Sequence, residues 1–219
     1  ILLFVLKPFN LGEMVTAFIV LQAAMPASTI LVILGMEYDG AFAQYLVCPD
    51  SNLIKINKDV PVDRAIFAEP LNVAMGGLKK IKIMPGDNVV IVGGGPIGMY
   101  FCKLCKDMGA GKVIITGRSE FRRPYIIQSG ADRIVNTNEE NLQSVIREEM
   151  PLGADIAIEC VGTTIDDCID AVRPGGKVLV VGLNELATQE ISQHKIARWG
   201  IDVLGTFIGV NTMQAVANG

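Results

Sequence analysis

An apolar run that breaks into glycines and then resumes with helical spacing constrains the fold of this chain more than any other feature. The run reads VVIVGGGPIGMY and extends from Val89 to Tyr100. Continuous Val and Ile are typical of a strand buried on both faces of a sheet. Glycine, which has no Cβ, accepts backbone angles that close a tight turn. The stretch therefore predicts a buried strand, a turn and the start of a helix.

The same alternation of apolar runs with helical spacing continues along the chain. Further strands are predicted at 112–117, 133–136, 154–162, 177–182 and 201–207, with helices between most of them and a turn at 174–176. Parallel strands need such crossover helices. The pattern predicts an α/β fold with a doubly wound parallel Rossmann sheet. Before the sheet, 69–81 has helical spacing and 40–56 alternates like the strands of a β-rich unit.

Charge and cysteine usage narrow the environment and the partners. The formal net charge of −4 argues against nucleic acid as the main partner. Five cysteines without regular spacing argue against a disulfide framework and favour a reducing, cytoplasmic compartment. Residues 14–36 carry no charge and are long enough to span a membrane. Because Pro26 interrupts this run and basic residues do not flank it, we expect no membrane span.

The glycines after the first strand fit the spacing G-x-G-x-x-G. Gly93 would allow the tight turn, Gly95 the approach of a pyrophosphate, and Gly98 the close packing of helix on strand. Pro96 and Ile97 lie in the same first turn of the helix, whose free N–H groups would face the phosphates. This context predicts a dinucleotide site. A methyltransferase with a similar glycine turn is the main alternative.

The end of the second strand bears on the choice of cofactor. A site for NAD usually has Asp or Glu there, about 20 residues after the glycines, to bind the ribose hydroxyls. This chain instead has Gly117, Arg118 and Ser119, followed by Arg122 and Arg123. Arginines suit a 2′-phosphate, so NADP is favoured over NAD. The alternative interpretation is that these arginines only form a solvated loop and helix face.

The carboxyl ends of the later strands supply the remaining cofactor candidates. Small residues and backbone groups there would line the nicotinamide end of the site. These candidates are Val161, Gly162, Val181, Gly182 and Thr206. Cys160, at the same edge, is expected to pack near the nicotinamide rather than to react.

From about Gly35 to its end, the chain resembles the medium-chain, zinc-dependent alcohol/polyol dehydrogenases, most of all their sorbitol/threonine dehydrogenase-like branch. The resemblance rests on four stretches in this order: AFAQYLVCP, AEPLNVAMGGLKKIKIMPGDNVVIVGGGPIGM, GADIAIECVG and VRPGGKVLVVGL. It implies a Rossmann dinucleotide-binding domain at 69–219 and, at 1–68, a remnant of a β-rich, GroES-like catalytic domain. It also implies a homo-oligomer.

The activity implied by the resemblance is hydride transfer between NAD(P) and a secondary alcohol or polyol, or its ketone, with a catalytic zinc. Of the family's zinc ligands, only the acid of the EP pair matches, at Glu69. The early cysteine and the His-Glu pair would lie upstream of Ile1, so we expect the chain to be incomplete at both ends and the catalytic residues to lie outside it. Two alternatives stay open: a non-catalytic NAD(P)-binding fragment, and a zinc-free, quinone reductase-like enzyme.

Overall fold

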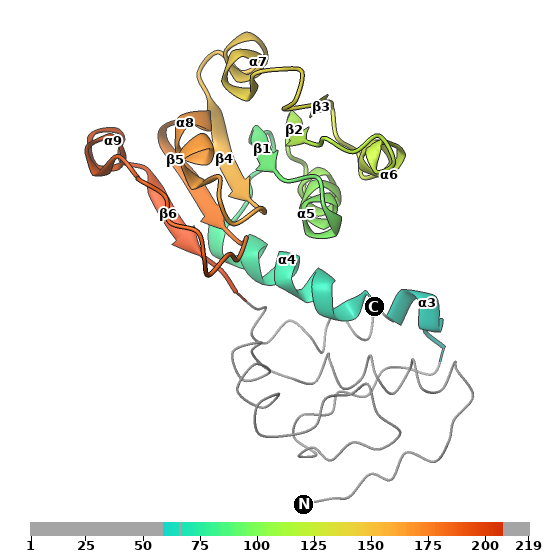
Figure 1. Ribbon diagram of the computed structural model, residues 1–219. Helices are drawn as coiled ribbons and strands as arrows, with labels where there is room; N and C mark the ends of the chain where they lie inside the picture. Colours follow the sequence, from blue (N-terminus) through green and yellow to red (C-terminus); the bar gives the residue numbers. More distant parts are fainter. Residues whose placement is uncertain (1–58, 66, 208–219) are drawn as a thin grey trace, which may run out of the picture. The chain divides into compact units, whose positions relative to one another are not determined.

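The computed structural model describes residues 59–65 and 67–207 (Figure 1). The chain divides into two compact units, and the sheet lies in the unit Gly77–Thr206. The other unit comprises Ile1–Gly76 and Phe207–Gly219. The β-rich segment expected at 40–56, the apolar run at 14–36 and most of the expected GroES-like remnant lie outside the described residues. The predicted domain boundary at 68/69 stays a prediction.

A six-stranded parallel sheet forms the centre of the unit, in the order β3-β2-β1-β4-β5-β6. The first strand along the chain lies between the second and the fourth, so the strand order reverses beside β1. This confirms the predicted α/β fold with a doubly wound parallel sheet. The strands are β1 (Val89–Val92), β2 (Val113–Thr116), β3 (Arg133–Val135), β4 (Ala154–Glu159), β5 (Val172–Val180) and β6 (Asp202–Gly205).

Helices connect the strands and cover the sheet (Figure 1). The helices that connect the strands are α5 (Pro96–Asp107), α6 (Arg123–Gln128), α7 (Leu142–Glu149), α8 (Ile165–Ala171) and α9 (Gln193–Trp199). Two further described helices precede the first strand along the chain, α3 (Val62–Ala65) and α4 (Ala68–Ile81). Val90 and Val92 pack in one cluster with buried residues of α7 and α8. On the opposite face, α4 comes so close that a Cβ on Gly77 would lie 2.8 Å from Leu179 and 2.9 Å from Phe101 of α5. Both faces of β1 are therefore buried, as its apolar run predicts.

Besides the short helix α3, which was not predicted, two segments differ from the sequence prediction. The predicted turn at 174–176 lies inside β5, because Ala154 pairs with Val172 while Ile156 pairs with Lys177. Residues 173–176 thus bulge out of the ladder beside Asp155, and Gly175 adopts a φ of +73°. Helix α9 was not predicted; its N-cap Ser192 accepts a hydrogen bond from the N–H of Lys195, and it ends at Gly200 in the left-handed conformation.

Within residues 59–65 and 67–207, none of the helices is both long enough and apolar enough to cross a membrane.

Candidate functional site

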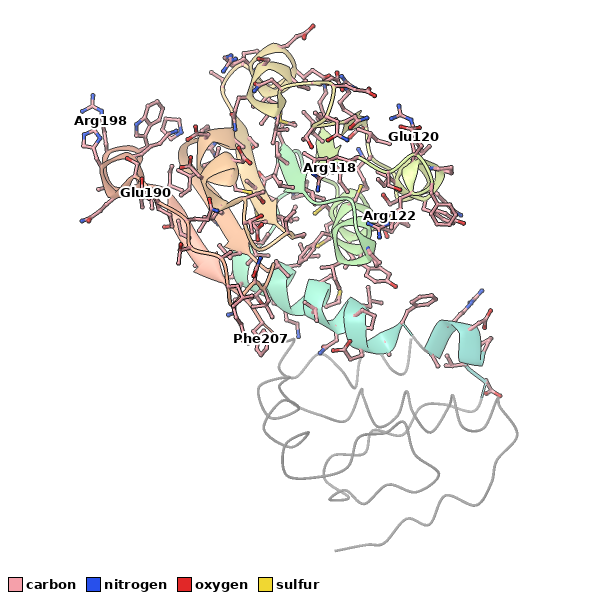
Figure 2. The ribbon with its side chains drawn as sticks, in the orientation of Figure 1. Arg118, Glu120, Arg122, Glu190, Arg198 and Phe207 are labelled. Carbon is pink, nitrogen blue, oxygen red and sulfur yellow. The ribbon has the colours of Figure 1, made fainter. Side chains whose placement is uncertain are left out.

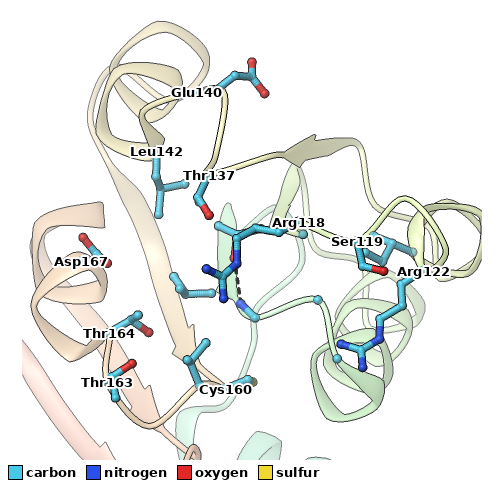
Figure 3. Close-up of a pocket in the computed structure, with 18 of the residues that line it drawn as sticks. Arg118, Ser119, Arg122, Thr137, Glu140, Leu142, Cys160, Thr163, Thr164 and Asp167 are labelled. Carbon is cyan, nitrogen blue, oxygen red and sulfur yellow. Dashed lines mark hydrogen bonds between the residues drawn. The ribbon is translucent and has the colours of Figure 1, made fainter. Parts of the chain in front are cut away.

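A cavity of about 810 Å³ opens at the carboxyl ends of β1, β2 and β4 (Figure 3). In open α/β sheets this edge, where the strand order reverses, is the usual place for ligands. Four connections line the cavity. Together with the strand ends that they follow, they contribute Val92–Gly95 at β1, Thr116–Ser119, Arg122 and Ile126 at β2, Thr137 and Glu140–Gln143 after β3, and Cys160, Val161, Thr163, Thr164 and Asp167 after β4.

The three glycines of the motif differ in whether the structure requires a residue without a side chain at their position. Gly93 has a φ of +119°, which side chains rarely adopt. A Cβ on Gly98 would lie 1.9 Å from the carbonyl oxygen of Gly93, so helix and turn could not approach as they do. Gly95 is different: its φ of −84° suits any residue, and a Cβ there would have no described atom within 4 Å. The packing of the described residues therefore does not explain Gly95, which lines the cavity.

The glycine turn is tied to the end of β2. The N–H of Gly93 donates a hydrogen bond of 2.9 Å to Oγ1 of Thr116, the last residue of that strand (Figure 3). Thr116 is 6% exposed and also lines the cavity. Sequence reasoning missed this residue; a polar side chain at the end of the apolar run VIIT is the signal that could have pointed to it.

The β2–α6 turn brings positive charge to the cavity. Arg118, Ser119 and Arg122 line it, and both arginines are exposed. Figure 3 shows Arg118 extending across the cavity, while Arg122 lies beside Ser119 on the α6 side. Among residues 59–65 and 67–207, no ion pair uses either guanidinium. Glu120 is exposed and is not one of the lining residues, and Figure 2 shows it at the outer side of the turn.

The β4–α8 loop forms the wall across β1 from the arginines. Val161, Thr163 and Thr164 line the cavity, together with Cys160. Burial raises the pKa of the Cys160 thiol, and the neighbouring Glu159 adds to this effect. The thiol is therefore protonated at neutral pH and is a weak nucleophile, in keeping with the packing role expected for it.

The other predicted cofactor residues do not line this cavity. Pro96, Ile97 and Gly98 form the first turn of α5 directly after Gly95, and Arg123 is exposed at the start of α6. The N–H groups of Val181 and Gly182 both donate to the carbonyl oxygen of Glu159. The remaining ones are Gly162, which packs against Leu183 and Asn184, and Thr206, which is 5% exposed with no partner for Oγ1 among the described residues.

The one predicted metal ligand within the chain, Glu69, lies in the first turn of α4. It is partly buried, and this burial raises the pKa of its carboxyl group. Over 59–65 and 67–207, no three His, Cys, Asp or Glu side chains gather where they could hold a metal ion. The described residues therefore do not assemble a zinc site by themselves.

The parallel sheet and the reversal of strand order define a Rossmann fold, with the glycine turn and the cavity at the edge where such folds hold their ligands. Residues 96–218 match the family described as zinc-binding dehydrogenase. The chain belongs to this family, which confirms the resemblance found in the sequence.

Relatives and solved structures agree with this assignment. The chain is 35% identical over 178 residues to the L-threonine 3-dehydrogenase of Shewanella frigidimarina, a match that covers 79% of this chain and 51% of that protein. Alcohol dehydrogenase TADH from Thermus sp. ATN1 is 30% identical with a TM-score of 0.75, over 81% of this chain and 54% of that one. For a zinc-binding dehydrogenase from Sinorhizobium meliloti 1021 bound to NADP, the identity is 29% and the TM-score 0.74, over 82% of this chain and 54% of that one. The chain thus spans about half the length of the relatives it matches.

Proposed function

We propose that this chain binds a nicotinamide dinucleotide in the cavity after β1, with the pyrophosphate against Gly95 and the N-terminus of α5. The carrying observation is the open space in front of Gly95, which no described residue fills. Helix α5 has 12 residues and begins directly after this glycine, so its free N–H groups and the positive end of its dipole favour a phosphate there.

NADP is the cofactor that the charges favour. Arg118, Arg122 and the hydroxyl of Ser119 lie where the second strand ends, and neither guanidinium has an ion-pair partner among the described residues. A 2′-phosphate on the adenosine ribose would supply that partner, and charge-assisted bonds from arginine are among the strong ones. The related dehydrogenase of Sinorhizobium meliloti is bound to NADP, which supports this choice.

In the whole protein, the reaction would be reversible hydride transfer between the cofactor and a secondary alcohol or polyol, or its ketone. The names of the relatives support this class, since the side chain of L-threonine carries a secondary alcohol. Zinc would be a second cofactor of the whole protein, with Glu69 as the candidate ligand that this chain contributes. The proposal includes a cytoplasmic homo-oligomer, for which the sheet edge β6, with Val203 38% exposed, is the candidate contact.

The test compares Gly95→Ala with Gly205→Ala, measuring NADP binding by calorimetry and stability by thermal unfolding. A Cβ on either glycine would have no described atom within 4 Å, and neither has the positive φ that would strain alanine, but only Gly95 lines the cavity. We expect Gly95→Ala to weaken NADP binding about tenfold or more, because its methyl group would occupy the place of the pyrophosphate. Gly205→Ala should bind like the wild type. A wild-type chain without dinucleotide affinity, or equal affinity in both variants, would overturn the proposal.

A further inference from the structure

A buried carboxylate lies beneath the β4–α8 loop, outside the cavity. Glu159 is the last residue of β4 and is 1% exposed. Its Oε1 accepts hydrogen bonds from the N–H groups of Val161 (3.0 Å), Gly162 (2.8 Å) and Thr164 (3.3 Å). It also accepts one from the Thr164 hydroxyl at 2.6 Å. One oxygen atom thus holds most of the loop between strand and helix.

The loop that Glu159 holds is a wall of the cavity. Val161 and Thr164 donate to the carboxylate through their backbone N–H groups and also line the cavity, as does Thr163 between them. Glu159 itself does not line the cavity. The carboxylate therefore acts on a ligand only through the shape it gives to this loop.

The other side of the carboxylate is sealed by the residues after β5. A Cβ on Gly182 would lie 2.6 Å from Oε2 of Glu159 and 2.1 Å from the nitrogen of Gly162. Oε2 has no hydrogen-bond partner among the described residues. A buried carboxylate oxygen without a partner is costly. The hydrogen bonds that Oε1 accepts from the β4–α8 loop therefore best explain why a glutamate stands at this buried position.

We propose that Glu159 is a positioning residue, which holds the β4–α8 loop in the conformation that receives the cofactor. This inference rests on the proposed function, because it assigns the ligand of the cavity to a dinucleotide. Val161 and Gly162 were expected at the nicotinamide end, but Val161 lines the same cavity as Arg118 and Ser119. We therefore assign the loop to the half of NADP that carries adenosine and its 2′-phosphate instead.

The strand β4 offers a matched control at its other end. Asp155 also accepts a backbone N–H, that of Asn88 at 2.7 Å, and pairs with Arg173 at 2.6 Å. It does not line the cavity. Replacing Asp155 by alanine also removes a carboxylate that accepts a backbone N–H, but this carboxylate makes no hydrogen bond to the β4–α8 loop among the described contacts.

The experiment measures the binding of NADP and of adenosine 2′,5′-bisphosphate to the full chain and to Glu159→Ala, Glu159→Gln and Asp155→Ala. We expect Glu159→Ala to weaken the binding of both ligands about tenfold, because three N–H groups of the loop lose their acceptor. Glu159→Gln keeps an acceptor oxygen and should restore binding to within about threefold of wild type. Asp155→Ala should lower the melting temperature and leave both affinities unchanged.

Amide hydrogen exchange gives a readout that does not depend on the ligand. Exchange at Val161, Gly162 and Thr164 should accelerate in Glu159→Ala and stay slow in Asp155→Ala. Normal affinity in Glu159→Ala, or equal losses in the Gln and Ala variants, would overturn the inference. Failure of the wild-type chain to bind either ligand would instead overturn the proposed function. If Glu159→Ala does not fold, Thr164→Val, which removes only the hydroxyl donor, replaces it and should show a smaller loss in the same direction.

Discussion

The turns after β2 and β4 line one cavity from opposite sides of β1, but they are built on opposite principles. The β2–α6 turn presents Arg118 and Arg122 as exposed cations without ion-pair partners among the described residues. The β4–α8 loop is held by the buried carboxylate of Glu159, which the cavity does not reach. The first turn supplies charge for recognition, whereas the second supplies shape.

This difference indicates whether a substitution in each turn should change ligand binding or the stability of the fold. Exposed charges cost little to keep in water, so removing them should change ligand binding and leave folding nearly intact. A buried carboxylate and the glycine packed against it are part of the folded structure, so changes there should first lower stability.

Among the substitutions that test this division, Gly182→Ala should be the most damaging. Its Cβ would lie 2.1 Å from the nitrogen of Gly162 and 2.6 Å from Oε2 of Glu159, and these backbone and carboxylate atoms cannot simply turn away. Overpacking of this kind costs about 3 kcal/mol of the free energy of unfolding. Urea denaturation measures it, with Gly205→Ala as the control, where a Cβ would have no described atom within 4 Å. A loss no larger than that of the control would mean that the loop after β5 does not seal the carboxylate.

Replacing Arg118 and Arg122 together by alanine should affect recognition instead. Losing two charge-assisted partners of a 2′-phosphate should weaken NADP binding by about 2 to 3 kcal/mol, while NAD, which lacks this phosphate, keeps its affinity. Arg123→Ala is the matched control, because Arg123 is exposed at the start of α6 and does not line the cavity. Isothermal titration with both cofactors measures the change. Equal losses for NAD and NADP would argue against a 2′-phosphate site at this turn.

The salt concentration should distinguish the contributions of the two turns without any mutation. At 1 M ionic strength the Debye length falls to about 3 Å, so the attraction between exposed arginines and the 2′-phosphate is screened. We expect NADP affinity to fall several-fold more than NAD affinity between about 0.1 and 1 M salt. The exchange protection of Val161 and Gly162 should not change, because their acceptor is buried. A similar salt response for both cofactors would contradict a charge-based choice of NADP.

Sequence reasoning predicted the fold well because long apolar runs and glycines are local signals. All six strands and the order of helices α4 to α8 follow from them, whereas the short helix α3 was not predicted. Helix α9 escaped prediction because it has no buried residues and therefore no apolar stripe. The bulge in β5 escaped because Gly175 and Gly176 signal a turn equally well on their own.

The cavity was predictable only in part, because its walls come from four separate connections. The motif spacing pointed to Gly93 and Gly95, and the absence of an acid at the end of β2 pointed to Arg118 and Ser119. The residues that α7 contributes, such as Leu142 and Gln143, carry no motif and become neighbours of these groups only through the tertiary fold.

The role of Glu159 could not be predicted from the sequence either. In the sequence it is one acid at the end of the run ADIAIE, and an acid there reads equally well as a ligand contact or a solvated strand end. Only the three-dimensional arrangement shows that the Glu159 side chain is buried. It also shows that a side chain on Gly182 would collide with the Glu159 carboxylate.

Thr164→Val should have the smallest effect and gives the finest test of the comparison. The change keeps the shape of the side chain but removes the hydroxyl that donates to Glu159 at 2.6 Å, while the weaker bond from the backbone N–H at 3.3 Å remains. Losing one donor to a charged acceptor should lower the free energy of unfolding by about 1 to 2 kcal/mol. Because Thr164 also lines the cavity, Thr163→Val provides the control: it changes a lining hydroxyl that has no bond to the carboxylate among the described contacts. Thermal unfolding should distinguish the two variants, and equal stability would mean that the hydroxyl bond to Glu159 contributes little to holding the loop.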